Sequence, residues 1–205
     1  MSVVLVPAER LERWVTNFQG RHGDTALAVA GGSLTGLAAD GSTFTARLPF
    51  AATYAGVPDA AAFAAAVTEP VEWGVLLVRK GGFAVARLAG DEIVESKVGQ
   101  RHVQGRTKAG GQSQQRFARR RDNQARQAYE AAADHAARIL DGLGRRGAVV
   151  VTGGDHPAVH EVLADPRLTG LVVVDPWLAV PDPRRGVLEE AVHDACSVGV
   201  DVTNA

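Results

Sequence analysis

The feature that most constrains the fold is a stretch of about 30 residues, 113–143, in which apolar residues recur close to the helical period. This period predicts one amphipathic helix about 45 Å long, which Gly142 and Gly144 end. Because the apolar stripe becomes regular only from about Ala125, we expect the first two turns to protrude from the domain. The apolar positions are Phe117, Ala125, Ala128, Ala132, Ala136, Ile139 and Leu143.

Shorter elements flank this helix on both sides. Three strand-like runs precede it and predict a β-meander. After it, two apolar runs indicate buried strands, each followed by a helix, and Asp155 is placed to cap the first of these helices. The order βββαβαβα predicts an α/β (α+β) fold, a mixed β-sheet with covering helices. The expected strands are 72–79, 83–88, 92–98, 148–151 and 171–174, and the expected shorter helices are 156–163 and 188–198.

The N-terminal residues form a separate pattern. Gly31-Gly32-Ser33 lacks the lysine and the helix that a phosphate-binding loop requires, which favours a turn. Thr68-Glu69-Pro70 is the expected boundary, so we predict an N-terminal accessory region over 1–68 and a second domain over 69–205. In the accessory region we expect a helix over 8–18, a hairpin of strands over 26–36 and 43–50, and a short helix over 59–67.

The charges are unevenly distributed along the chain. Its 205 residues include 22 Lys and Arg and 23 Asp and Glu, for a formal net charge of −1. Residues 97–126 hold nine of the cations and one of the acids, a net +8, so the other 175 residues hold 13 cations and 22 acids, a net −9. A basic segment in an otherwise acidic chain indicates a polyanionic partner.

The apolar runs, the N-terminus and the cysteine content indicate the compartment in which the protein acts. No run approaches the roughly 18 apolar residues that a membrane span needs, and the N-terminus lacks the basic region of a signal peptide. With one cysteine, Cys196, the chain cannot form an internal disulfide, which suits a reducing compartment. We therefore expect a cytoplasmic protein with no membrane partner.

A polar, glycine-rich and basic segment, 99–111, leads into the long helix and carries the most specific chemical signal. At its end, Gly110 and Gly111 allow backbone angles that are closed to other residues, and Gln112 follows. A glutamine amide donates and accepts hydrogen bonds but is not a strong base. Chemistry built on it would position a water and stabilise developing charge. By itself the tripeptide is better explained as a plain flexible turn.

Arginines surround the start of the helix. At about 100° per residue, Arg116, Arg119, Arg120 and Arg121 fall on different sides of its axis. A basic stalk with a neutral Gly-Gly-Gln tip suits insertion into a narrow channel of folded RNA, with the arginines on phosphates. The alternative is an ordinary solvated helix start.

The residues Gly110-Gly-Gln-Ser113, Arg116-Phe-Ala-Arg119 and Arg121 together resemble the GGQ loop and following helix of the central domain of eukaryotic and archaeal class-one peptide-chain release factors. About nine residue types match in register over twelve positions. The element order and the turn at Asp165-Pro166-Arg167 are also similar, and the resemblance covers roughly residues 70–200. It implies hydrolysis of the ester that joins a nascent peptide to tRNA, in the peptidyl-transferase centre of the large ribosomal subunit.

The resemblance also implies roles for individual residues. Gln112 would coordinate the attacking water, and its backbone N–H would stabilise the leaving ribose oxygen. Gly110 and Gly111 would permit the backbone turn, which completes the predicted catalytic set. Arg116, Arg119 and Arg121 would hold ribosomal RNA, whereas Arg120 and Arg126 are assigned on charge alone. All the candidate RNA-binding residues are Arg101, Arg106, Lys108, Ser113, Arg116, Arg119, Arg120, Arg121 and Arg126.

Full release factors carry a stop-codon-reading domain before the GGQ domain and a partner-binding domain after it. Here we expect neither, because the first 68 residues hold no recognisable codon-reading motif. The chain therefore resembles the Vms-like branch, the release-factor-like peptidyl-tRNA hydrolases of ribosome quality control, in a compact actinobacterial form. This implies a codon-independent, monomeric hydrolase without a cofactor, whose partners are the large ribosomal subunit and peptidyl-tRNA. A non-catalytic ribosomal-RNA-binding factor and a nuclease acting on the tRNA 3′ end stay open as alternatives.

Three other groups of side chains are weaker candidates. His156 and His160 are four residues apart on an expected helix, but no HExxH pattern is present, so we predict surface or capping histidines and no metal site. Cys196, near His193, is better explained as a buried structural thiol than as a nucleophile. Core packing is favoured over base stacking for Trp14, Trp73 and Trp177.

Overall fold

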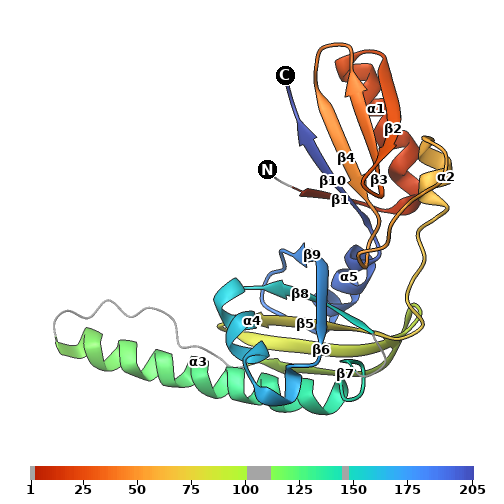
Figure 1. Cartoon of the computed structure of the whole chain (residues 1–205). Coiled ribbons are helices and arrows are strands. Elements are labelled where there is room, and N and C mark those ends of the chain that lie inside the picture. The colour runs from red at the N-terminus through yellow and green to blue at the C-terminus, as the bar shows by residue number, and fades with distance from the viewer. Residues whose placement is uncertain (1–2, 101–111, 145–147) are drawn as a thin grey trace. The chain divides into compact units, whose positions relative to one another are not determined.

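The computed structural model describes residues 3–100, 112–144 and 148–205, with the backbone alone for residues 100 and 112–124. The chain separates into two compact units (Figure 1). The first comprises Met1–Glu69 and His193–Ala205, and the second comprises Pro70–Val192. Each unit has its own five-stranded sheet and its own hydrophobic core.

An antiparallel sheet forms the first unit. Its strands are β1 (Val3–Val6), β2 (Thr25–Ala30), β3 (Ser33–Ala38), β4 (Thr43–Arg47) and β10 (Val198–Thr203), in the order β1-β10-β4-β3-β2. The 3-10 helix η1 (Ala8–Arg10) and the helices α1 (Leu11–His22) and α2 (Ala60–Ala64) accompany them. The strand expected over 26–36 is two strands, because Gly31 and Gly32 have φ angles of +56° and +75° and turn the chain. The turn predicted at these glycines is confirmed.

The core of the first unit joins residues from both ends of the chain. Successive side chains of a strand point to opposite faces of a sheet, so Val198 and Val200 of β10 face the same way, and both are fully buried. They belong to one cluster with Leu11, Val15 and Phe18, which recur at helical spacing along α1. Burial of these apolar side chains holds the C-terminal strand to the N-terminal elements.

The second unit contains the mixed sheet with covering helices that the sequence predicts. Its strands are β5 (Trp73–Arg79), β6 (Gly82–Ala89), β7 (Glu92–Gln100), β8 (Val149–Gly154) and β9 (Val172–Leu178). Its helices are α3 (Gln112–Ile139), α4 (His156–Leu163), the 3-10 helix η3 (Pro166–Leu168) and α5 (Arg185–Ala195). The strand order is β7-β6-β5-β8-β9, in which β5, β6 and β7 form the antiparallel meander and β8 and β9 add in parallel. The parallel step from β8 to β9 uses α4 and η3 as its crossover.

The C-terminal strand corrects the predicted division of the chain. The sequence pattern placed 69–205 in one domain, but β10 lies between β1 and β4 and pairs with both. The helix expected over 188–198 ends earlier, because α5 stops at Ala195 and the chain then enters the first sheet. Burial of Val198 and Val200 in that sheet outweighs the helical pattern of the preceding residues.

The long helix α3 begins one residue before its predicted start and ends four residues before its predicted end. Gly142, with φ +78°, lies in the turn that follows it, as expected for a residue beyond a helix C-terminus. Its length does not make it a membrane span: among the described residues, no helix is both long and apolar enough to cross a membrane.

The start of α4 corrects a second expectation. Asp155 occupies the predicted N-cap position, but its side chain makes no capping hydrogen bond. Its carboxylate instead lies 3.4 Å from the guanidinium of Arg79 in β5. The charged partner from a neighbouring strand outcompetes the local backbone N–H groups.

Candidate functional site

The candidate catalytic loop joins the edge strand β7 to the long helix α3. β7 ends at Gln100 and α3 begins at Gln112, so Gln112 is the first helical residue. The other two predicted catalytic residues, Gly110 and Gly111, lie outside the described residues. The same holds for three candidate RNA-binding residues, Arg101, Arg106 and Lys108. The fold thus defines the elements from which the loop leaves and to which it returns.

The position of Gln112 at a helix N-terminus has a chemical consequence. The first four backbone N–H groups of a helix have no acceptor within it, and the aligned peptide dipoles place partial positive charge there. A backbone N–H at this end can therefore donate to an oxygen that becomes negative during a reaction. This is the property that the resemblance implies for the N–H of Gln112.

The first half of α3 extends beyond the sheet (Figure 1). Residues 112–124 span about 20 Å at 1.5 Å per residue, and Ala125, which follows them, is partly buried against the core. Arg126, the next residue, is exposed. The helix carries Gln112 away from the core, as the sequence pattern predicts. Five candidate RNA-binding residues lie along this half: Ser113, Arg116, Arg119, Arg120 and Arg121.

Small residues bring the second half of α3 close to the sheet. Ala132 and Ala136 are fully buried and share one cluster with Phe83 and Val85 of β6. The Phe83 ring also stacks with the imidazole of His135, with 5.6 Å between ring centroids. This packing makes the second half the foot of α3, from which the first half extends.

Tyr129 is the first large side chain that the foot of α3 buries, and it is 8% exposed. Burial raises the pKa of its phenol above the ordinary value of 10.0, and the negative charges of Glu161 and Asp155 raise it further. Each of these effects disfavours the phenolate. Tyr129 therefore stays neutral at the pH of a cell and acts as a packing residue.

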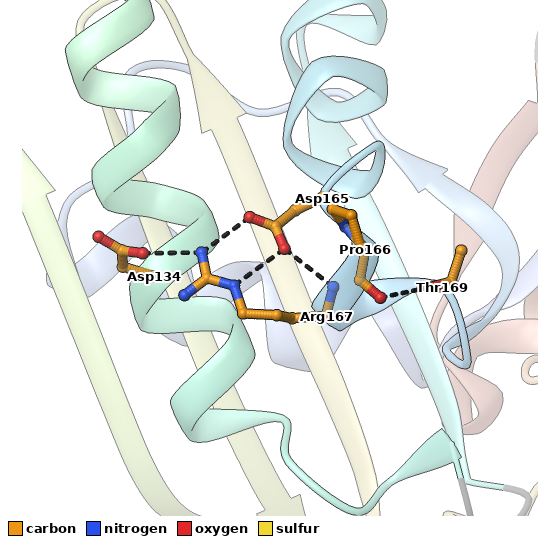
Figure 2. Close-up of polar contacts among 5 residues, drawn as sticks. All are labelled: Asp134, Asp165, Pro166, Arg167 and Thr169. Atoms are coloured by element: carbon orange, nitrogen blue, oxygen red, sulfur yellow. Dashed lines mark hydrogen bonds and ion pairs between the residues drawn. The ribbon is translucent and has the colours of Figure 1, made fainter.

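Polar contacts also hold the foot of α3 to two other elements. Arg138 forms an ion pair with Glu95 of β7. One turn earlier, the Asp134 carboxylate accepts a hydrogen bond of 2.7 Å from Nη2 of Arg167 in η3 (Figure 2). The Arg167 guanidinium also donates from Nε and Nη2 to the Asp165 carboxylate, at 2.9 and 2.7 Å.

These contacts shift the pKa values of Asp165 and Arg167. The hydrogen bonds from the Arg167 side chain and backbone N–H lower the pKa of the Asp165 carboxyl to about 2. The Asp165 and Asp134 carboxylates in turn raise the pKa of Arg167, so Asp165 and Arg167 stay charged at neutral pH. Sequence reasoning noticed the Asp165-Pro166-Arg167 turn but did not select Arg167 or Asp134 as functional residues, because their proximity arises only in the folded chain.

The histidine and cysteine that are weaker candidates for a metal site or a nucleophile lie in the following surroundings. The His156 ring lies on Trp177, with 3.6 Å between centroids and 13° between planes. In the parts of the chain that the structure describes, no group of three or more His, Cys, Asp or Glu side chains could hold a metal ion. Cys196 is partly exposed, which corrects the buried thiol expected there.

The tryptophans pack as predicted. Trp73 is fully buried, and its Nε1 donates to the carbonyl oxygen of Gly90 at 2.7 Å. Trp14 and Trp177 are partly buried against the cores of the first and second units respectively. The predicted core role of these three residues is confirmed.

The comparison with protein families matches most of the chain. The family model described as Actinobacteria/chloroflexi VLRF1 release factor matches residues 71–201. These residues are more than half of the chain and include the whole mixed sheet, the described part of the candidate site and most of β10. The comparison with curated proteins finds no match.

Proposed function

Because the chain belongs to the Actinobacteria/chloroflexi VLRF1 release-factor family, we propose that it is a codon-independent peptidyl-tRNA hydrolase that releases nascent chains from stalled or obstructed large ribosomal subunits. Family membership by itself gives a release-factor-like role at the ribosome. The observation that supports the specific reaction is the place of Gln112, the first residue of a helix whose first half extends beyond the sheet.

In the proposed reaction, a water attacks the carbonyl carbon of the ester between the peptide and the terminal ribose of the tRNA. The side-chain amide of Gln112 holds this water in place, and the backbone N–H of Gln112 donates to the ribose oxygen as the C–O bond breaks. Gly110 and Gly111 let the backbone approach the ester closely. The products are a peptide with a free carboxylate and a tRNA with a 3′-hydroxyl. One proton of the water goes to the ribose oxygen, and the other is released to solvent.

The basic segment supplies the proposed affinity for ribosomal RNA. Its cations contact phosphates of the peptidyl-transferase centre, with the helix arginines round the stalk and the remaining cations on the loop. Since each neutralised phosphate releases counterions, affinity should fall steeply as salt rises. The partners in this proposal are the large subunit and its peptidyl-tRNA, and the protein acts in the cytoplasm as a monomer.

The decisive experiment measures peptide release from isolated large subunits that carry peptidyl-tRNA. Gln112→Ala should lower the release rate by roughly 100- to 1,000-fold, the usual effect of removing one positioned polar group from a transition state. Gln115→Ala removes the same side chain about one turn further along and is the matched control, with release near the wild-type rate. Binding to the subunit should survive in both variants. Wild-type release by Gln112→Ala, or no release by the unmodified protein, would refute the proposal.

The same assay separates the two alternatives. For a non-catalytic RNA-binding factor, Arg119→Glu and Arg121→Glu would abolish binding, while no peptide would be freed and Gln112→Ala would change nothing. For a nuclease, the tRNA would leave the reaction shortened at its 3′ end. An intact tRNA with a free 3′-hydroxyl supports ester hydrolysis.

A further inference from the structure

Between the large buried side chains of Tyr129 and Ile139, the apolar contact between α3 and the sheet is shallow. Three of its fully or nearly fully buried residues are alanines, Ala132, Ala133 and Ala136. Alanines let a helix approach closely but form shallow ridges, whereas larger side chains interdigitate and resist sliding and tilting. A helix seated on such a face needs further contacts to hold its direction.

Arg167 supplies a contact with a fixed geometry. Its own backbone N–H donates to the Asp165 carboxylate at 2.9 Å, and its side chain grips the same carboxylate through two N–H groups. The Asp165 side chain is 20% exposed, and Leu168, which follows Arg167, is buried in the core beside α3. The guanidinium is therefore oriented by its own turn, and Nη2 reaches Asp134 on α3 (Figure 2).

The distance from this contact to the tip makes its geometry matter. Asp134 lies 22 residues after Gln112, which is about 33 Å along the helix. A tilt of about 5° at the foot would move the tip by about 3 Å over that length. A displacement of 1 Å can already cost a catalytic group about 100-fold in rate.

We propose that Arg167 is a positioning residue for the release reaction, because it ties α3 through Asp134 to the Asp165 turn and so sets the direction of the helix half that carries Gln112. This inference rests on the proposed function. The ion pair of Arg138 with Glu95 ties the same helix to β7, so α3 is held at successive turns by two different elements.

The ion pair of Arg167 with Asp134 orients α3 but contributes little to the overall stability of the protein. The side chains of Arg167 and Asp134 are 52% and 68% exposed, and exposed ion pairs contribute little to the free energy of unfolding. Arg167→Ala should therefore lower the Tm by less than about 4 °C. A purely structural role would lower the Tm and the release rate together, whereas a positioning role lowers the rate with little change in Tm.

The first test measures helix direction without any reaction. Nitroxide labels at Gln114→Cys and Val71→Cys, in a Cys196→Ser background, report the distance from the stalk to the second unit by pulsed electron paramagnetic resonance. Arg167→Ala and Asp134→Asn should each broaden or shift the distance distribution. The control is Arg185→Ala, which breaks an exposed ion pair with Glu189 on α5 and should leave the distribution unchanged.

The second test measures release on large subunits. Arg167→Ala should lower kcat at least tenfold while KM changes less than twofold. Arg167→Lys keeps the positive charge but loses the paired N–H groups of the guanidinium, and it should recover part of the rate. The double variant, Arg167→Ala with Asp134→Asn, should release peptide no more slowly than the slower single variant, because both changes remove the same contact between Arg167 and Asp134. An unchanged distance distribution together with an unchanged kcat overturns the inference. If the unmodified protein releases no peptide, the proposed function fails, and the distance measurement still decides whether Arg167 sets the direction of α3.

Discussion

Replacing Val200 by alanine should unfold the first unit more easily and leave the second unit unchanged. Val200 is fully buried in β10, where it lies opposite Val4 of β1 and Ala46 of β4. The residue lies near the C-terminus, yet its neighbours belong to the N-terminal sheet. A chain whose domains divide once, at residue 69, would show the opposite behaviour.

The size of the effect follows from the burial. Val→Ala removes two carbons from a site with no exposed surface, which costs about 1.6 kcal/mol at about 0.8 kcal/mol per carbon. The cavity left behind raises the total to about 2–3 kcal/mol. With a urea m-value near 2 kcal/mol per molar, the midpoint for the first unit should fall by about 1–1.5 M.

Hydrogen exchange read by mass spectrometry during a urea titration can follow each unit separately. Peptides from β4 report the first unit, and peptides from β5 report the second. Val150→Ala in β8, also fully buried, should lower the midpoint for β5 instead, and Val173→Ala, at a site 44% exposed, should lower neither by more than a fraction of the effect. Equal shifts of β4 and β5 on Val200→Ala would refute separately stable units. A shift of β5 alone would refute the placement of β10.

Three further outcomes test the second unit. In a Tyr54→Phe background, absorbance at alkaline pH should show Tyr129 ionising above the ordinary tyrosine value of 10.0, because burial disfavours its phenolate; titration at or below that value would contradict its burial. Gly74→Ala should cost about 1–3 kcal/mol in urea unfolding, since the new Cβ would lie 2.7 Å from Leu140 Cδ2 in a closed core; an unchanged midpoint would contradict that packing. The pKa of Asp165 is lowered to about 2, so its contribution to stability is present above the unfolded pKa near 4 and is lost as the pH falls toward 2. Asp165→Asn should therefore flatten the fall in Tm between pH 4 and pH 2, and an identical fall in the variant would contradict the ion pair.

The parts of the fold that sequence predicts are those whose signals are local. The period of α3 is a property of one continuous segment, so the existence of this helix follows from the residues themselves. Ala125, where the apolar stripe becomes regular, is partly buried against the core. The meander of β5, β6 and β7 is likewise predicted by short apolar runs and glycine turns. The parallel addition of β8 and β9 follows from the apolar runs at their starts, Val149–Val151 and Val172–Val174.

The strand β10 was missed because its signal depends on distant partners. The alternation of Val198, Val200 and Val202 is a strand pattern, but it directly follows a helix whose apolar period continues into it. What decides between the two is pairing with Thr43–Arg47 and Val3–Val6, more than 150 residues earlier. Tertiary pairing overrides local preference at such a position.

The candidate site divides in the same way. The place of Gln112 at the start of a long helix is a local property that the sequence predicts. The contacts that direct that helix are not predicted by the sequence. Asp134 and Arg167 are 33 residues apart, and they meet only because η3 lies beside the foot of α3. No pattern within either segment marks the pair.

The charge imbalance gains a structural meaning from these ion pairs. Outside residues 97–126 the chain has 13 cations and 22 acids, and five of those cations are each engaged with carboxylates within their own unit: Arg47, Arg79, Arg138, Arg167 and Arg185. The remaining acids outnumber the remaining cations, so this part of the surface should repel a ribosomal phosphate surface. Under the proposed function, the net attraction to RNA would then come from the loop and the first half of α3, the segment that carries Gln112. An approach that presents any other surface would be opposed, so the field that attracts the protein to RNA would also orient it.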